Sequence, residues 1–250
     1  MLSLARAILE ESATDYQGLI EVMLPQERTM AVFTLSGGQA EAAWHRLAAA
    51  GSRKGLKPLL LGTPESFELH METLGMAQEE EQGLVDPEEW LRQAYSLDLD
   101  DWIASRLEDH LFEAGEWQEQ ERLPEAASTS SILSRQDFVY GALLDITETS
   151  HLPAWLNFGS AGACPAVPIH IAFLKRWSEF QIDCLCLSEE CFLVNVNKPP
   201  QASNRECLRL AREHFAYCPE ILTATQGKPL SLSQYAAGLA HSSQWQFSWS

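Results

Sequence analysis

The negative charge of this chain is confined to its first 150 residues, and most of it lies in one stretch. Residues 1–150 contain 28 acidic and 10 basic side chains, whereas residues 151–250 contain seven of each. Between Glu65 and Glu125 there are 19 acidic residues against three basic ones, a net charge of −16. This composition predicts amphipathic helices whose apolar residues form inward seams and whose carboxylates form an acidic outer face.

The charge restricts the class of partner. An acidic field repels nucleic acid and anionic membrane surfaces, and it steers a basic protein into contact. We therefore expect a basic protein partner, no nucleic-acid partner and no membrane partner. The alternative is that the acidic stretch is only a solvated helical face that keeps the protein soluble. The sequence gives no expectation for the oligomeric state.

The rest of the composition indicates a folded, soluble protein. The chain has 250 residues, of which 46% are hydrophobic, with eight Trp, ten Phe and five Tyr. Residues 1–10 predict an amphipathic helix and not a signal peptide, because Glu10 and Glu11 interrupt the apolar pattern. No apolar run approaches the roughly 20 residues that span a bilayer. We expect a soluble, cytoplasmic protein.

All six cysteines lie between residues 164 and 218. Cys184 and Cys186 alternate with aliphatic residues in a predicted strand, where a free cysteine behaves as a small hydrophobic residue. The Cys-x-Cys spacing followed by Cys191 lacks the paired short spacings of a zinc site. We expect reduced, mostly buried thiols and no metal.

The first half of the chain predicts a crossover unit followed by three short helices. Residues 28–35 and 57–62 have strand composition, and residues 39–50 between them form an Ala-rich helical pattern. Thr63 and Asp86, each followed by proline and acidic residues, predict helix N-caps. The inward seams of the helices over residues 65–120 come from apolar residues, namely Trp90, Tyr95, Trp102, Leu107 and Leu111.

The second half predicts a strand, a helix, a hairpin, two helices and a final strand. These elements cover residues 137–146, 168–180, 182–187 with 191–197, 203–215, 231–240 and 244–249. We expect five aromatic residues to share one core: Phe173, Trp177, Phe215, Trp245 and Phe247. The fold class is α+β, with mixed sheets and packed helices. Residues 1–125 form an N-terminal α/β part that carries the acidic helical segment (about 63–125), and residues 136–250 form a C-terminal α+β domain.

No motif in the sequence indicates catalysis, so we expect no catalytic residues, no metal and no cofactor. Gly159-Ser-Ala-Gly162 lacks the Gly-x-Ser-x-Gly pattern of a nucleophile elbow, and the histidines show no metal-binding spacing. An enzyme that uses the Trp155–Cys164 loop and Cys218 is the weakest alternative. The predicted partner-binding residues are acidic side chains of the charged stretch: Glu79, Glu80, Glu81, Asp86, Glu88, Glu89, Asp98, Asp100, Asp101, Asp109, Glu113 and Glu116.

The C-terminal region resembles a bacterial domain-of-unknown-function family, number 4253. The resemblance rests on four motifs: Trp155-Leu-Asn-Phe-Gly159 with Cys164-Pro165, Leu174-x-x-Trp177, Ala211-x-Glu-His-Phe-Ala-Tyr-Cys-Pro-Glu220 and Trp245-x-Phe-x-Trp249. It extends to residues 55–62 and is patchy over residues 63–135.

Members of this family occur near secreted toxins, and the chain also resembles immunity proteins of the type VI secretion system. The resemblance implies a non-enzymatic, cytoplasmic inhibitor of a nuclease toxin. A nuclease presents Lys and Arg to phosphate, and an acidic segment can occupy that surface. The alternative from a different class is an acidic adaptor, a chaperone or a regulator, with a basic partner.

Overall fold

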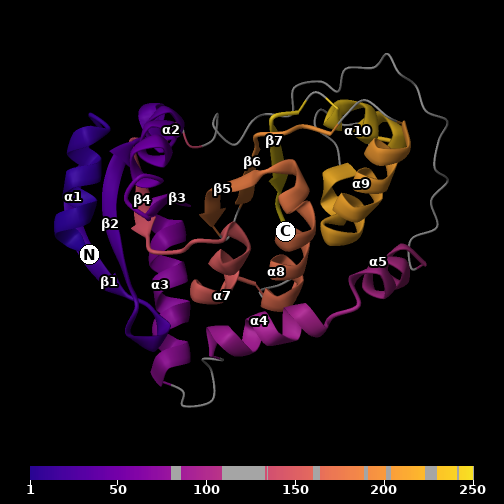
Figure 1. The fold of residues 1–250 in the computed structure, drawn as a ribbon, viewed down its shortest axis with the longest axis horizontal. Helices are drawn as coiled ribbons and strands as arrows, with labels where there is room; N and C mark the ends of the chain where they lie inside the picture. The colour runs from indigo at the N-terminus through magenta and orange to yellow at the C-terminus, as the bar shows by residue number, and fades with distance from the viewer. Residues whose placement is uncertain are drawn as a thin grey trace.

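One mixed sheet of seven strands runs through the described part of the chain, in the order β1-β2-β4-β3-β5-β6-β7 (Figure 1). The computed structural model describes residues 1–79, 86–108, 133, 135–159, 164–188, 191–200, 204–222, 230–240 and 242–249, with the backbone alone at 73–79 and 204. The strands are β1 (Gln17–Met23), β2 (Thr29–Ser36), β3 (Lys57–Gly62), β4 (Phe138–Leu144), β5 (Ile182–Ser188), β6 (Cys191–Val196) and β7 (Gln244–Phe247).

Helices cover both faces of this sheet, so the expected α+β class is confirmed, with one mixed sheet in place of several. The α-helices are α1 (Leu2–Glu11), α2 (Ala40–Gly51), α3 (Pro64–Glu79), α4 (Pro87–Ser96), α5 (Leu99–Glu108), α7 (Leu152–Trp155), α8 (Val167–Arg176), α9 (Asn204–Tyr217) and α10 (Leu232–Leu239). Short 3-10 helices span Pro25–Glu27, Gly37–Gln39, Thr149–His151, Trp177–Phe180 and Pro219–Leu222.

The predicted strand-helix-strand unit is present as β2, α2 and β3, but β4 lies between its two strands. β4 pairs antiparallel with both neighbours, so β2 and β3 run parallel to each other. Gly141 of β4 lies under Phe33, and a Cβ at this position would stand 2.9 Å from the Phe33 ring. A glycine is required here because the phenyl ring occupies the space of any side chain.

The sheet is continuous between the two halves of the sequence. β4, from the second half, sits between β2 and β3 of the first half, and β3 pairs parallel with β5 at Leu60 and Cys186. The division into domains 1–125 and 136–250 stays a prediction.

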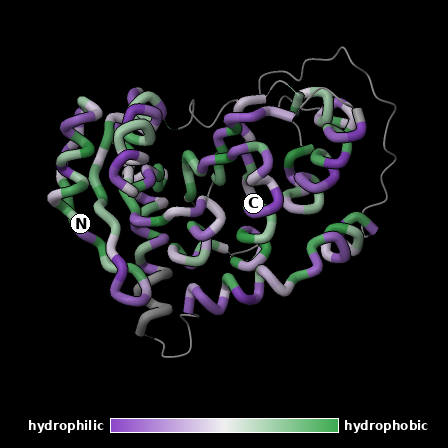
Figure 2. The backbone as a smooth tube through the Cα atoms, in the orientation of Figure 1, coloured by the Kyte–Doolittle hydropathy of each residue, from purple (hydrophilic) through white to green (hydrophobic). Residues whose placement is uncertain are grey.

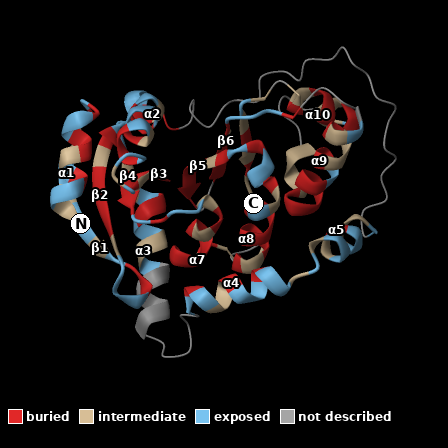
Figure 3. Cartoon of the chain, in the orientation of Figure 1, coloured by how far each residue is buried: buried red, intermediate tan, exposed pale blue. Residues whose placement is uncertain are grey.

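Strand alternation divides the apolar residues between the two faces of the sheet. On β2, Phe33 and Leu35 point to the side covered by α1 and α2, whereas Met30 and Val32 join the larger cluster under α8, α9 and α10. Figure 3 shows the central strands as buried, with exposed residues concentrated on the outer helices. All five aromatic residues predicted to share one core lie in the larger cluster, which confirms that prediction.

Two further features bear on the sequence expectations. No described helix is long and apolar enough to cross a membrane. The six cysteines form no disulfide with one another, and all but Cys164 are buried, as expected.

Candidate partner-binding surface on helices α4 and α5

Helices α4 and α5 each begin with an aspartate that caps the helix. The side chain of Asp86 accepts a 2.9 Å hydrogen bond from the backbone N–H of Glu88, and Pro87 occupies the first helical position. Asp98 accepts hydrogen bonds of 3.1 Å from the backbone N–H groups of Asp100 and Asp101. Acidic residues in the first turn are favourable at the positive end of the helix dipole. The predicted cap at Asp86 is confirmed.

The inner face of both helices packs on the C-terminal half. Leu91 and Ala94 of α4 are buried against α7 and α8, and Ile103 of α5 joins the main core. The Trp102 ring meets Phe173 edge-on, with centroids 5.6 Å apart. Figure 2 shows the resulting alternation of hydrophilic and hydrophobic residues along α4. These contacts fix the helices to the body of the protein.

The sequence pattern wrongly predicts that Tyr95 points inward. Tyr95 is 50% exposed, whereas Trp90, Trp102 and Leu107 are half-buried. The Lys175 ammonium lies 3.7 Å from the centre of the Tyr95 ring, and the Tyr95 hydroxyl hydrogen-bonds His151 Nε2 at 3.0 Å. These polar neighbours hold the ring at the surface. The other predicted seam residue, at position 111, lies outside the described residues.

The outer face of α4 and α5 carries most of the predicted binding residues that the structure describes. Asp86, Glu88, Asp98, Asp100 and Asp101 are exposed and Glu89 is half-buried. Glu79 ends α3, but its side chain is not described. The remaining predicted residues lie outside the described residues: Glu80, Glu81, Asp109, Glu113 and Glu116.

Two of the carboxylates on this face are neutralised within the chain. Arg92 pairs with Glu89, and Arg176 Nη1 lies 2.6 Å from Asp100 Oδ1. Asp86, Glu88, Asp98 and Asp101 form no ion pair with any residue that the structure describes. We call these four residues the acidic face; Asp86 also accepts a hydrogen bond from the Gln26 side chain, and all four residues are exposed to a partner.

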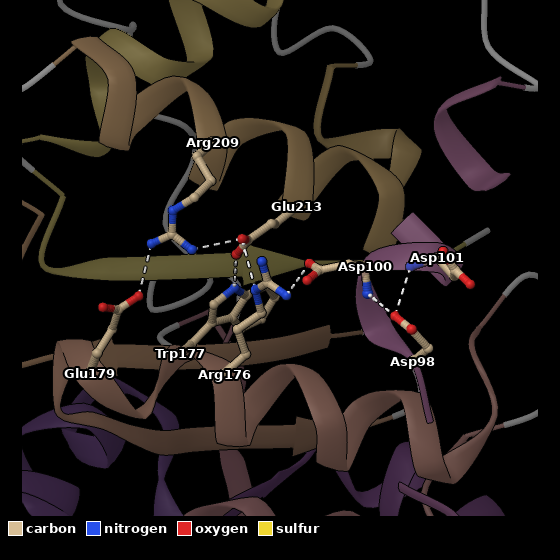
Figure 4. A network of polar contacts seen from close by, with 8 residues as sticks. All are labelled: Asp98, Asp100, Asp101, Arg176, Trp177, Glu179, Arg209 and Glu213. Carbon is tan, nitrogen blue, oxygen red and sulfur yellow. Dashed lines mark hydrogen bonds and ion pairs between the residues drawn. The ribbon is translucent and has the colours of Figure 1, made fainter. Parts of the chain in front are cut away.

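A buried carboxylate on α9 connects this helix to the end of α8, beside α5 (Figure 4). Glu213 of α9 is 2% exposed and accepts hydrogen bonds from Arg176 Nε at 2.9 Å, Arg209 Nη1 at 2.8 Å and Trp177 Nε1 at 3.1 Å. Arg209 also pairs with Glu179 at 2.8 Å. Arg176 therefore bridges the buried Glu213 and the exposed Asp100, and it links α9 to α5.

A groove of about 780 Å³ separates α5 from α9. Asp100, Ile103 and Leu107 line one side of it. The remainder of the lining mixes Leu208 with charges of both signs, namely Arg176, Arg205, Arg209 and Arg212 together with Glu206 and Glu213. Arg176 and Arg209 are paired with carboxylates, so the groove presents no block of unpaired positive charge. Sequence reasoning missed the groove because its two sides are about 100 residues apart in the chain.

The loop proposed for the enzyme alternative holds a neutral thiol beside a neutral imidazole. Cys164 Sγ lies 3.3 Å from His170 Nε2, and His170 Nδ1 hydrogen-bonds the Tyr217 hydroxyl. Burial raises the pKa of the Cys164 thiol to about 12 and lowers the pKa of His170 to about 3. In the described part of the chain, no group of three or more His, Cys, Asp or Glu side chains could hold a metal ion.

Comparison with known families finds a match in the C-terminal region. Residues 142–250 match the family model described as a domain of unknown function, DUF4253, as the motifs of this region predicted. The motif residues Trp177, Tyr217 and Phe247 pack on one another, with ring centroids 4.9 to 5.4 Å apart. The chain has no match among curated proteins or solved structures.

Proposed function

We propose that this protein is a non-enzymatic immunity protein that binds and neutralises a secreted nuclease toxin through its acidic face. The observation that supports this proposal best is the set of four exposed carboxylates on α4 and α5 that form no ion pair with a described residue. The helices that carry them are held by buried apolar contacts, so the charges are presented on an ordered scaffold.

The chemistry of a nuclease surface complements this face. A nuclease contacts phosphate through Lys and Arg, and an acidic surface can occupy those side chains in place of nucleic acid. Complementary charge also accelerates encounter, which an inhibitor of a lethal enzyme requires. The resemblance of the chain to type VI secretion immunity proteins such as TsiT supports the same class of partner.

A capture experiment in the native host tests the proposal. The tagged protein is used to isolate its partner, which is identified by mass spectrometry and then expressed with and without this protein. We expect a basic nuclease whose toxicity disappears on co-expression. Capture of a basic protein without nuclease activity would support the alternative function of an acidic adaptor, and would overturn the immunity proposal.

Matched charge variants then test the acidic face. The variant Asp86→Asn, Glu88→Gln, Asp98→Asn and Asp101→Asn removes four charges and keeps both caps, because asparagine caps helices as well as aspartate. The control removes four exposed charges elsewhere: Glu10→Gln, Asp15→Asn, Glu27→Gln and Asp137→Asn. Protection from the toxin should be lost in the first variant and retained in the second.

A further inference from the structure

A second cavity, of about 340 Å³, lies at one end of the sheet, and none of its lining residues belongs to α4 or α5. It is enclosed by the end of α2, the first residues of β3 and β5, and the segment that follows β4. Its volume lies within the range of small-molecule pockets, about 300–1,000 Å³. No residue of the acidic face lines it, so its role is separate from the proposed toxin contact.

The inner wall of this cavity is apolar. Trp44, Leu56, Ile146 and Leu152 line it and are all 5% exposed or less. The Trp44 indole N–H donates a 3.0 Å hydrogen bond to the backbone carbonyl of Pro58. The indole polar atom is therefore satisfied within the protein, and the ring offers apolar surface to an occupant.

Three linked polar side chains line the same cavity. Lys57 Nζ donates to Thr149 Oγ1 at 2.9 Å and lies 3.6 Å from Asp183 Oδ1. The Thr149 hydroxyl donates to Asp183 Oδ1 at 3.4 Å, and Asn197 Nδ2 donates to Asp183 Oδ2 at 3.0 Å. Lys57 and Asp183 are 31% and 41% exposed, so this cluster is accessible from solvent.

The hydrogen-bonding capacity of this cluster is not exhausted. An ammonium group has three donors, and two of those on Lys57 are directed to Thr149 and Asp183. A carboxylate has about four acceptor sites, and Asp183 uses three of them. One donor on Lys57 and one acceptor on Asp183, on the oxygen that Asn197 contacts, therefore remain within the same cluster.

The charge of the cluster selects the class of ligand. Lys57 and Asp183 neutralise each other, and the net charge of −18 on the chain disfavours an anion. A cation would meet the Lys57 ammonium. An uncharged group with an acceptor next to a donor satisfies both remaining sites, and a carboxamide is such a group.

We propose that this cavity binds a small, uncharged molecule with an apolar body and a carboxamide-type head. The head lies between Lys57 and Asp183, and the body lies against Trp44 and Leu152. The combination of an apolar cavity and a few convergent polar groups is typical of ligand pockets.

Titration with three probes of one shape tests the class of ligand. Benzamide, benzoate and benzylammonium are each titrated into the full chain, and the Trp44 indole N–H resonance is followed by NMR. We expect saturable binding of benzamide at low millimolar concentration or below, and at least tenfold weaker binding of the two charged probes. Benzoate or benzylammonium binding as tightly as benzamide, or no benzamide binding up to about 20 mM, would overturn the proposal.

A matched pair of variants locates the site. Ala48 is half-buried and lines the cavity, whereas Ala49 is exposed and does not. Ala48→Leu should fill the cavity and weaken benzamide at least tenfold, while Ala49→Leu should leave it unchanged. Lys57→Met should also weaken benzamide, because it removes the free donor. Equal affinity in Ala48→Leu and Ala49→Leu would place benzamide elsewhere and refute the site.

Discussion

Glu213 and Trp177 form a buried polar pair: the indole N–H of Trp177 donates to the Glu213 carboxylate at 3.1 Å. The Trp177 ring also stacks on Phe247, with an interplanar angle of 10°. α8, α9 and β7 therefore meet at one tryptophan. Arg176 and Arg209 supply the charge that allows a carboxylate to be buried at this position.

Replacing Glu213 should therefore be strongly destabilising. Glu213→Ala leaves the buried indole N–H without an acceptor and removes the shared partner of two arginines. Loss of one member of a buried pair typically costs about 3–5 kcal/mol. Glu179→Ala is the control, since it removes only an exposed partner of Arg209 and should cost less than about 1 kcal/mol. Urea unfolding followed by circular dichroism measures both, and equal costs would contradict this role of Glu213.

Asp98 has a structural role that its position in an acidic run conceals. Asp98→Ala removes the cap of α5 and should cost about 0.5–2 kcal/mol, whereas Asp98→Asn should cost little. Asp98→Lys combines charge reversal with loss of the cap, so it is not a clean test of binding. Thermal unfolding of the three variants is the measurement. Equal stability of the alanine and asparagine variants would show that the cap contributes nothing.

Two buried histidines, His170 and His214, and the half-buried His70 should make the protein sensitive to mild acid. Burial lowers the pKa of His70 to about 4 and of His170 to about 3, and it holds the pKa of His214 well below its ordinary value. Above pH 6.5 these histidines are neutral in both the folded and the unfolded protein. Below pH 6.5 the unfolded protein binds protons first, because its histidine pKa values are higher. The free energy of unfolding therefore falls as the pH falls toward the folded-state pKa values. Between pH 7.5 and 5.5 each histidine should cost about 1.4 kcal/mol.

Urea unfolding at these two pH values checks the total loss, about 4 kcal/mol for the three histidines. His70→Gln should reduce that loss by about a third. A pH-independent free energy of unfolding over this interval would contradict the assignment of neutral, buried imidazoles.

The thiols should react slowly in the folded protein. Burial raises the pKa of Cys164 to about 12 and of Cys218 to about 11, so at pH 8 the thiolate fraction of Cys164 is roughly a thousandfold below that of an ordinary cysteine. Reaction with an aromatic disulfide reagent should be slow in buffer and complete for six thiols in urea. One fast thiol per chain that disappears in Cys164→Ser would favour the enzyme alternative.

The sequence predicts those helices and strands in which the spacing of apolar residues, or a capping residue, is clear within one short segment. The caps at Thr63 and Asp86 and the final strand were correctly predicted, because each depends on residues within one turn or one strand. The Thr63 hydroxyl accepts a 3.3 Å hydrogen bond from the backbone N–H of Ser66 at the start of α3. β1 was missed because its four apolar residues stand in adjacent pairs, Leu19-Ile20 and Val22-Met23, and do not alternate with polar ones. None of its residues is buried, and Ile20 and Met23 are 54% and 66% exposed. α7 was missed because it has four residues and begins beside Pro153.

Long-range arrangements were not predictable from local patterns. The position of β4 between β2 and β3 depends on pairing across more than 70 residues. The same limit applies to the candidate site. Amphipathic spacing identified the exposed carboxylates of α4 and α5, but it could not show that Arg176 neutralises Asp100 or that Lys175 and His151 hold Tyr95 at the surface.

The association rate with the captured partner tests the acidic face most directly. It is measured by stopped flow for the wild type, the four-site acidic-face variant and the matched control, at about 50 mM and about 500 mM salt. Exposed complementary charges act mainly on association and are screened within about 8–10 Å at moderate salt. The account predicts a wild-type rate that falls at least tenfold with salt, a slow and salt-insensitive rate for the four-site variant, and wild-type behaviour for the control. Equal, salt-independent rates for all three proteins would contradict it.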